Sequence, residues 1–400
     1  MISVGIDVSK DKSIVCIIKP GGEVLAAPFE MPHTMESLLS LISLLKGYEE
    51  ETRVVLEATG HYHYPVVHML MDNGIFVTCV NSLRMSRYCS QSIRKGKTDK
   101  IDAIKIASYG ITYWSELELV RSRGDAYEEL RLLSRQYYQH SSILIKSKIN
   151  LGNLLDQAMP GIKTLLHSEN RTNKYLHVVE RYWHFGNILQ MGETTFIDDF
   201  CEWGKKQRYL KNEAIAKRLY ALAQSGITTL PVSDTTKCVI FEAVKMALES
   251  EKSKDSIMLR MQELARTLPE HETVLAMGGV GPVLAPRLIA EIGDVCRFHS
   301  GSALVAYAGI DAPEHQSGAF RSESRRISKR GNKYLRKTGY EVMMLTMSHK
   351  PCDDAVHNFI RKKMSEGKRG KLALIAGLNK FLRIYYARVS EVYQNLDMSI

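Results

Sequence analysis

The segment ISVGIDVSKDKSIVCIIKPGGEVLAA, residues 2–27, decides the fold class that the sequence predicts. The polar stretch SKDK and the turn PGG divide it into three β-prone runs, at 2–8, 13–18 and 23–27. The hydrophobic spacing further along predicts a helix, a strand, a helix and a strand, at 34–45, 53–58, 65–71 and 76–80. This is the element order of an RNase H-like α/β domain, although order alone leaves other α/β folds open.

The rest of the chain is predicted to be mainly helical. A basic loop at 84–97 precedes a helix that starts near Thr98, and long helices are expected at about 126–157 and 235–268. In the first long helix a heptad seam (130, 137, 144 and 151, with 133 and 154) is interrupted by His140 and Ser147. Pairing as a coiled coil and packing of an amphipathic helix on a core therefore remain equally open. Residues 160–235 show mixed helical patterns and no recognisable chemistry.

The composition is that of an ordinary globular protein with a basic balance of charge. The chain has 400 residues, which is more than one hydrophobic core usually spans. Of these residues, 44% are hydrophobic and 24% are charged. Its net charge is +10, and eight of the seventeen residues from Arg321 to Lys337 are Lys or Arg. Such a balance favours nucleic acid as partner, because each cation that meets a phosphate releases counterions.

The same composition excludes several classes of protein. No apolar run approaches the roughly 20 residues that cross a bilayer, and the first residues do not resemble a signal peptide. The cysteines show no C-x-x-C spacing, which argues against a zinc site and a disulfide framework and suits a reducing cytoplasm. They are Cys16, Cys79, Cys89, Cys201, Cys238, Cys296 and Cys352.

Four carboxylates are candidates for a metal site. Asp7 and Glu57 each interrupt an apolar strand, where an unpaired carboxylate costs several kcal/mol. Asp99 and Asp102 are three residues apart near a helix start, so both project from one face. If the first and fourth strands are neighbours, the four converge into the oxygen-rich site that two Mg²⁺ ions need for phosphoryl transfer.

Each carboxylate also has a simpler interpretation. Asp99 or Asp102 alone suits a solvated helix start, where the macrodipole favours an acid. Glu57 alone could be a salt-bridged strand residue. Asp7 could belong to the phosphate-binding hairpin of an actin-like ATPase or sugar kinase, although no second phosphate loop or adenosine motif is visible. The set of four, in this order and on these elements, favours the metal site.

Two further motifs lie in the C-terminal half. Gly279 and Gly281 lie in a hairpin between two short helices, which either binds a phosphate through backbone N–H groups or is a plain helix–turn–helix corner. Ser317 lies in a Gln-Ser-Gly loop, where the residues alone favour a turn serine. As a nucleophile it would need activation and nearby cations. The candidate nucleic-acid contacts that follow, which a solvated basic face also explains, are Arg321, Arg325, Arg326, Lys329, Arg330, Lys333 and Arg336.

Together the motifs GIDVSK, VLEATG, KTDKIDA, GGVGP, YAG, QSG and ISKRGNKYLR resemble the insertion-sequence-110 family of DEDD transposases. The likeness covers residues 1–155 and 270–350. It implies a RuvC-like domain whose Asp, Glu, Asp, Asp tetrad matches Asp7, Glu57, Asp99 and Asp102, and a serine nucleophile that matches Ser317.

The resemblance also implies partners and a domain plan. It implies recombination through a phosphoserine-type DNA intermediate, an element-encoded bridge RNA and a dimeric or tetrameric assembly in a bacterial or archaeal cytoplasm, associated with the nucleoid. The expected regions are a RuvC/RNase H-like catalytic domain at 1–115, a helical coiled-coil and middle insert at 120–270, a mainly α serine transposase domain with a helix-hairpin-helix-like element at 271–350, and a basic helical tail at 351–400. A water-using junction resolvase and a non-catalytic nucleic-acid-binding protein remain the competing hypotheses.

Overall fold

The structure is a computed structural model that describes residues 1–58, 60–90, 98–120, 124–167, 174–206, 213–312, 326–351 and 354–397, with the backbone of 316–317 and 320–321. The chain divides into two compact units, Met1–Ser122 and Arg123–Ile400. None of the helices within these ranges combines the length and apolarity that crossing a membrane requires.

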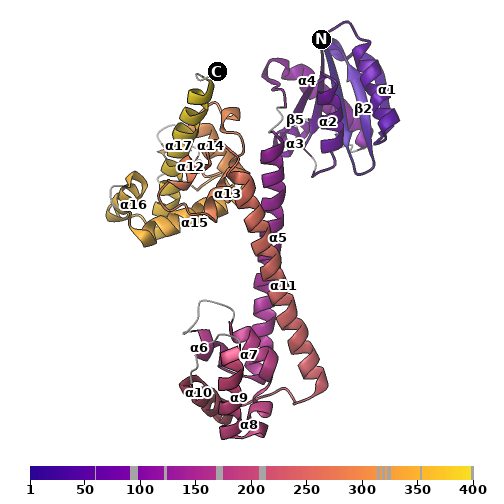
Figure 1. The fold of residues 1–400 in the computed structure, drawn as a ribbon. Coiled ribbons are helices and arrows are strands. Elements are labelled where there is room, and N and C mark those ends of the chain that lie inside the picture. Colours follow the sequence, from indigo (N-terminus) through magenta and orange to yellow (C-terminus); the bar gives the residue numbers. More distant parts are fainter. Residues whose placement is uncertain are drawn as a thin grey trace. The chain divides into compact units, whose positions relative to one another are not determined.

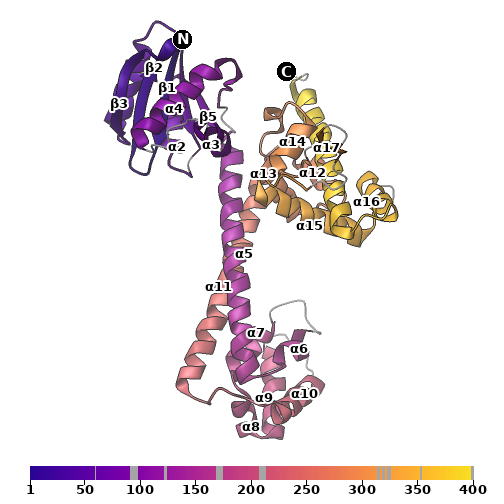
Figure 2. The same cartoon turned by 180° about the vertical axis from the view of Figure 1, so that it is seen from behind.

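The first unit is built on a five-stranded sheet in the order β3-β2-β1-β4-β5 (Figures 1 and 2). The strands are β1 (Ile2–Val8), β2 (Lys12–Ile18), β3 (Val24–Pro32), β4 (Thr52–Glu57) and β5 (Phe76–Val80). β1, β2 and β3 pair antiparallel, whereas β1, β4 and β5 pair parallel. This strand order confirms the predicted RNase H-like class, and β3 extends further than the sequence pattern indicated.

Helices cover both faces of this sheet. One face of β1, formed by Ile2, Val4, Ile6 and Val8, packs with α1 (Met35–Lys46) and α2 (Tyr64–Asp72) in a single apolar core. The opposite face packs against α4 (Asp99–Thr112), whose Ala103 and Ala107 lie against β2. Short 3₁₀ turns occupy Pro20–Gly22 and Trp114–Glu116.

The prediction of a basic loop at 84–97 is wrong for the first part of that range, because residues Ser82–Ser90 form the helix α3. Its first turn is held by Asn81, whose Oδ1 accepts the N–H of Leu83 at 2.8 Å. Met85 anchors the helix and is only 1% exposed. One buried methionine among polar residues is too weak a periodic signal to indicate a helix. Residues 91–97 of the predicted loop lie outside the described residues.

The second unit contains two long helices, α5 (Asp125–Ala158) and α11 (Asp234–Ala265), which lie side by side (Figures 1 and 2). Both match the predicted long helices. Ser147 lies in the buried seam of α5, and Ala243 and Ala247 are buried along α11. Of the two residues that interrupt the heptad, Ser147 is thus a small buried side chain, whereas His140 is partly exposed.

Five helices between α5 and α11 surround a separate apolar core that includes Phe185, Phe196 and Leu219. They are α6 (Ile162–His167), α7 (Lys174–Tyr182), α8 (Phe185–Met191), α9 (Glu193–Lys206) and α10 (Glu213–Ser225). This is the middle region in which the sequence indicated mixed helical patterns.

The C-terminal part has its own core, to which α17 contributes Phe381, Leu382 and Tyr385. Its helices are α12 (His271–Leu275), α13 (Leu284–Ile292), α14 (Gly301–Ala308), α15 (Lys333–His349), α16 (Ala355–Ser365) and α17 (Gly370–Asp397). A 3₁₀ turn at Val295–Arg297 and the short strands β6 (Gln316–Ser317) and β7 (Phe320–Arg321) complete it. Residues 351–397 therefore pack into the same core as residues 271–350.

Candidate active site

Asp7 and Glu57 occupy matching positions at the carboxyl ends of two neighbouring strands. β1 and β4 run parallel with Ile6 opposite Leu56, so the next residue of each strand is a carboxylate. Side chains alternate between the two faces of a strand, which puts Asp7 on the same face as Gly5. Both acidic residues are partly buried.

Helix α4 covers this face and runs against the direction of β1. A Cβ atom on Gly5 would lie 2.2 Å from the backbone N of Ala107 and 2.3 Å from the carbonyl oxygen of Ala103. One on Gly110 would lie 2.1 Å from Ser3 Oγ. The C-terminal half of α4 therefore lies over the start of β1, and its first turn points toward the end that carries the acid.

That first turn carries Asp99 and Asp102. Thr98 begins the helix as predicted, because its Oγ1 accepts the N–H of Ile101 at 3.2 Å. Two strand residues advance about 6.6 Å and four helix residues about 6 Å. The distance along β1 from Gly5 to Asp7 therefore matches the distance along α4 from Ala103 back to Asp99.

The thiol of Cys89 is affected by the charges around this edge of the sheet. Burial raises its pKa, Lys105 lowers it, and Asp102 and Glu57 raise it. Because electrostatic effects weaken with distance, carboxylates from two different elements lie near the same thiol. Lys105 also forms an ion pair with Asp102, with 3.7 Å between Nζ and Oδ1.

The four carboxylates offer an all-oxygen donor set, which fits the coordination chemistry of Mg²⁺. Among the residues whose placement is described, no three His, Cys, Asp or Glu side chains lie close enough together to hold a metal ion. The backbone thus brings the four acidic residues to one edge of the sheet without gathering their carboxylates, and the metal site stays a prediction.

Ser317 lies in a short backbone hairpin. β6 and β7 pair antiparallel, with Ser317 opposite Phe320. The side chains of Ser317 and Arg321 lie outside the described residues, as does Arg325 altogether. The role predicted for the serine therefore stays a prediction.

The hairpin extends from two stems that are bonded to each other. The outgoing stem is residues 307–311 and the returning stem is residues 326–332. Ser328 donates its N–H to the carbonyl of Asp311, and Lys329 donates its N–H to the carbonyl of Gly309, each at 2.9 Å. A Cβ on Gly331 would lie 2.2 Å from the carbonyl oxygen of Tyr307, so only glycine lets the stems meet there.

The candidate basic contacts fall into two groups. Arg326, Lys329, Arg330 and Lys333 are exposed. Arg336 is different, because its NH1 donates to the carbonyl of Ala308 at 2.9 Å and to that of Gly331 at 3.0 Å. Its guanidinium therefore joins the stems.

The glycine hairpin lies between α12 and α13, as the sequence predicted. Gly279 has a φ of +78°, and a Cβ there would lie 2.1 Å from Thr346 Oγ1. Gly281 faces open space, and its carbonyl accepts the N–H groups of Leu284 and Ala285 at 2.9 Å. The first glycine is therefore required by packing against α15, and only the second is placed to approach a ligand.

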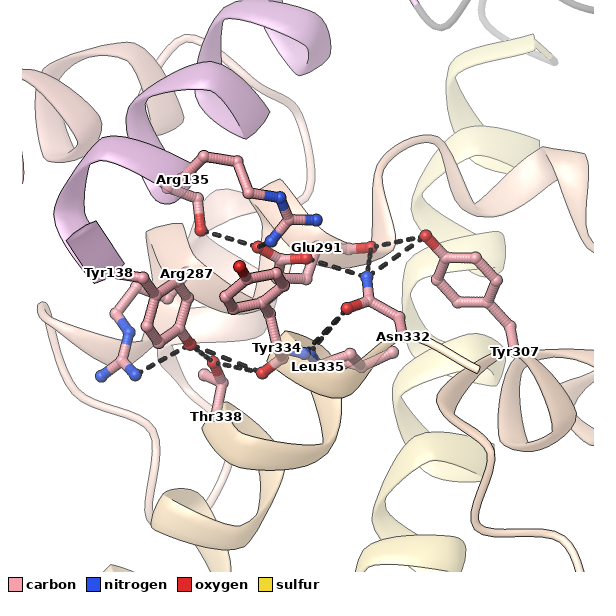
Figure 3. Close-up of polar contacts among 10 residues, drawn as sticks. Arg135, Tyr138, Arg287, Glu291, Tyr307, Asn332, Tyr334, Leu335 and Thr338 are labelled. Atoms are coloured by element: carbon pink, nitrogen blue, oxygen red, sulfur yellow. Dashed lines mark hydrogen bonds and ion pairs between the residues drawn. The ribbon is translucent and has the colours of Figure 1, made fainter. Parts of the chain in front are cut away.

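A buried polar network, shown in Figure 3, was missed by the sequence reasoning. Glu291 on α13 accepts hydrogen bonds from Ser134 Oγ and Arg135 NH1, each at 2.7 Å, and from Asn332 Nδ2 at 2.8 Å. One turn earlier on α13, Arg287 pairs with Glu341 at 2.6 Å. The available signal was two charged residues, four apart, inside the apolar helix LAPRLIAEI.

An RNase H-like sheet with acidic residues at adjacent strand ends, followed by a basic helical part, is the combination found in DEDD-type DNA transposases. Two family models agree with this class. One, described as a transposase of the DEDD IS110 type, matches residues 4–160. The other, described as transposase IS116/IS110/IS902 family, matches residues 271–358. Together they match more than half of the chain, which belongs to the IS110 family of transposases.

Relatives of similar length support this membership. The 44.8 kDa protein of insertion element IS116 from Streptomyces clavuligerus is 24% identical over 98% of this chain and 95% of its own length. Pilin gene-inverting proteins are also similar. That of Moraxella bovis is 21% identical and that of Moraxella lacunata 22% identical, each over 97% of this chain and 95% of its own length.

Two solved structures of Thermus thermophilus RuvC also align with the chain. RuvC in complex with a Holliday junction substrate aligns at 11% identity over 30% of this chain and 99% of its own, with a TM-score of 0.24. The other RuvC structure aligns at 12% identity over 30% of this chain and 100% of its own, with a TM-score of 0.25.

Proposed function

We propose that this transposase cuts and rejoins DNA in a divalent-metal-dependent reaction, with Ser317 as the nucleophile. Asp7, Glu57, Asp99 and Asp102 would hold the metal, two Mg²⁺ ions by our proposal. The observation that carries the proposal is the register of β1 and β4, which places Asp7 and Glu57 at matching positions at the ends of two neighbouring strands.

Bound divalent ions would supply charge neutralisation at the scissile phosphate and help to deprotonate the attacking hydroxyl. Ser317 Oγ forms a bond to phosphorus while one P–O ester bond of the DNA breaks. The serine proton leaves to a base or to water, and the departing DNA oxygen takes up a proton. In rejoining, a DNA hydroxyl attacks the phosphoserine and releases Ser317.

The exposed cations of the returning stem support this assignment. Arg326, Lys329 and Arg330 follow the serine hairpin directly, and Lys333 opens α15. A phosphate that approaches the hairpin would meet fixed positive charge, which stabilises the doubly charged transition state of phosphoryl transfer. These residues would also hold the DNA backbone independently of its sequence.

We extend the proposal to RNA guidance and assembly. The resemblance to the family implies a bridge RNA that pairs with donor and target DNA, and the net charge of +10 suits two nucleic acids. It also implies a homodimer or tetramer that brings the acidic and serine-bearing parts together on DNA in the cytoplasm, associated with the nucleoid.

A covalent trapping assay tests the nucleophile. Wild-type protein, Ser317→Ala and the control Ser322→Ala are incubated with Mg²⁺, labelled DNA of the element's ends and the transcript that flanks it. We expect a denaturation-resistant adduct with wild type and Ser322→Ala, and none with Ser317→Ala. Metal-dependent nicking without an adduct, unchanged in Ser317→Ala, would instead establish a nuclease that uses water.

A further inference from the structure

Glu291 carries a negative charge in the interior of the C-terminal part. Its side chain is 0% exposed, and its only ion-pair partner among the described residues, Arg135, is 28% exposed. A buried carboxylate is costly unless its oxygens are satisfied by hydrogen bonds. Ser134 and Arg135 bond one oxygen and Asn332 the other. The carboxylate therefore fixes the positions of groups on two other elements, α5 and the returning stem.

Asn332 connects Glu291 to the segment that carries Ser317. Its Oδ1 accepts the N–H groups of Tyr334 and Leu335, at 2.9 and 3.1 Å, and so caps α15. Its Nδ2 donates to Glu291 and also, at 3.3 Å, to the hydroxyl of Tyr307. Its own N–H donates to the carbonyl of Tyr307 at 2.7 Å. One asparagine thus joins the end of the returning stem to the start of the outgoing stem.

Two residues of α5, Arg135 and Tyr138, also contact this network. The guanidinium of Arg135 lies 3.8 Å from the centre of the Tyr334 ring, in the first turn of α15. The hydroxyl of Tyr138 contacts Thr338 and accepts from Arg287 NH2 at 3.0 Å. Figure 3 shows these contacts converging where α5, α13 and α15 meet. The serine stems are therefore positioned against α5, the first helix of the second unit.

We propose that Glu291 is a positioning residue for Ser317: through Asn332 it fixes both stems of the serine hairpin relative to α5. The inference rests on the proposed function, because it assumes that Ser317 is the nucleophile. Glu291 itself touches no substrate. A nucleophile on a short hairpin needs a rigid frame, since small displacements of the reacting atom greatly reduce the rate of reaction.

A hydrogen-bond reversal tests this role. Asn332→Asp removes the amide donor and sets two carboxylates against each other, although an aspartate at 332 still caps the helix. Glu291→Gln leaves a single amide oxygen, which can accept from Asn332 or from Ser134 and Arg135 but not from both sides. The double variant restores the bond in the opposite direction, because the glutamine amide can donate to the aspartate. We expect each single change to slow adduct formation about tenfold or more, and the double variant to return to within about threefold of wild type. DNA binding should stay within about twofold, because neither side chain is placed to meet a phosphate.

Glu270→Gln is the matched control, since it changes another buried carboxylate of the same core, which accepts from the hydroxyls of Tyr127 and Tyr393 and reaches neither stem. It should lower the melting temperature and leave the rate of adduct formation unchanged. Single variants that form adduct at the wild-type rate would overturn the inference, and so would a double variant slower than both. If Ser317→Ala still forms the adduct, the proposed function fails; if it does not and Glu291→Gln does, only this inference fails.

Discussion

Lys105 Nζ lies 3.7 Å from Asp102 Oδ1, and the two side chains are only 22% and 24% exposed. The lysine therefore places a positive charge beside a proposed metal ligand. It also lies near the thiol of Cys89, whose pKa is raised by burial and by the charge of Glu57. If the proposed site binds a metal, a cation at this position would partly neutralise the acidic edge and would repel a divalent ion that approaches it.

Replacing this cation should strengthen metal binding. We expect Lys105→Ala to bind Mn²⁺ about five- to tenfold more tightly, because a repulsion between partly buried charges is removed. Electron paramagnetic resonance of free Mn²⁺ during a titration without DNA measures this directly. Lys105→Arg should match wild type, as should Lys100→Ala, which removes an exposed lysine of the same helix. Unchanged or weaker binding by Lys105→Ala would contradict the prediction.

Asp7 offers a direct test of the carboxylate set. Asp7→Asn should abolish Mn²⁺ binding and reduce metal-dependent DNA cleavage on the order of a thousandfold, because a charged ligand is lost. DNA binding should persist, since the basic stems are untouched. Asp11→Asn, which changes an exposed acid after the same strand, is the control. Cleavage that survives Asp7→Asn would exclude the proposed metal site.

The two hairpin glycines should separate packing from ligand binding. Gly279→Ala forces a Cβ into Thr346 at a positive φ, so a loss of about 2–4 kcal/mol in unfolding free energy is expected. Gly281→Ala meets open space, so its melting temperature should match wild type. If the hairpin binds phosphate, Gly281→Ala weakens DNA binding at unchanged stability. Equal effects of both changes on stability would refute this distinction.

Among the basic residues, we expect some to contribute to stability and others to DNA binding. Arg336→Ala removes two hydrogen bonds that join the stems and should lower the melting temperature. Arg330→Ala should leave stability unchanged but weaken DNA binding and reduce the slope of log K against log salt by about 1. Binding measured at several salt concentrations, beside thermal unfolding, distinguishes the two. Equal salt slopes for Arg330→Ala and wild type would show that Arg330 meets no phosphate.

The stability of the middle helices should depend on pH through Asp199. Burial raises its pKa, but hydrogen bonds from Arg181 and Tyr182 outweigh this and hold it below 3.8. A depressed folded-state pKa adds stability above the unfolded-state pKa, and that stability is lost as pH falls through the folded-state value. Asp199→Asn should therefore lower the melting temperature at pH 7, and the difference should shrink as the pH falls below the ordinary range of an aspartate carboxyl group. Asp198→Asn, an exposed neighbour, is the control. A difference that is constant with pH would argue against the ion pair.

The sheet and its acidic residues could be predicted because the signals are local. Alternating strands, PGG and the Thr98 cap are each decided within a few residues, and the register of β1 and β4 then follows from the fold class. The helix cap at Asn332 is also a local feature, because it lies directly before the helix that it begins.

The polar network could not be predicted in this way. Asn332 lies 41 residues from Glu291, and Ser134 lies 157 residues from it, so no local pattern relates them. The role of Arg336 as a link between stems was hidden for the same reason, since a run of basic residues does not show which member bonds to backbone. Tertiary packing decides these roles, and sequence spacing does not record it.

Gly5 has a consequence for the ion that the proposed site accepts. A Cβ there would lie 2.2 Å from the backbone of α4, so any larger residue must push the helix away by roughly an ångström to regain ordinary contact. Metal–oxygen distances for Mg²⁺ and Ca²⁺ differ by only a few tenths of an ångström. The spacing between the acid-bearing strand and the acid-bearing helix, and with it the ionic radius that fits, is therefore set by a residue without a side chain.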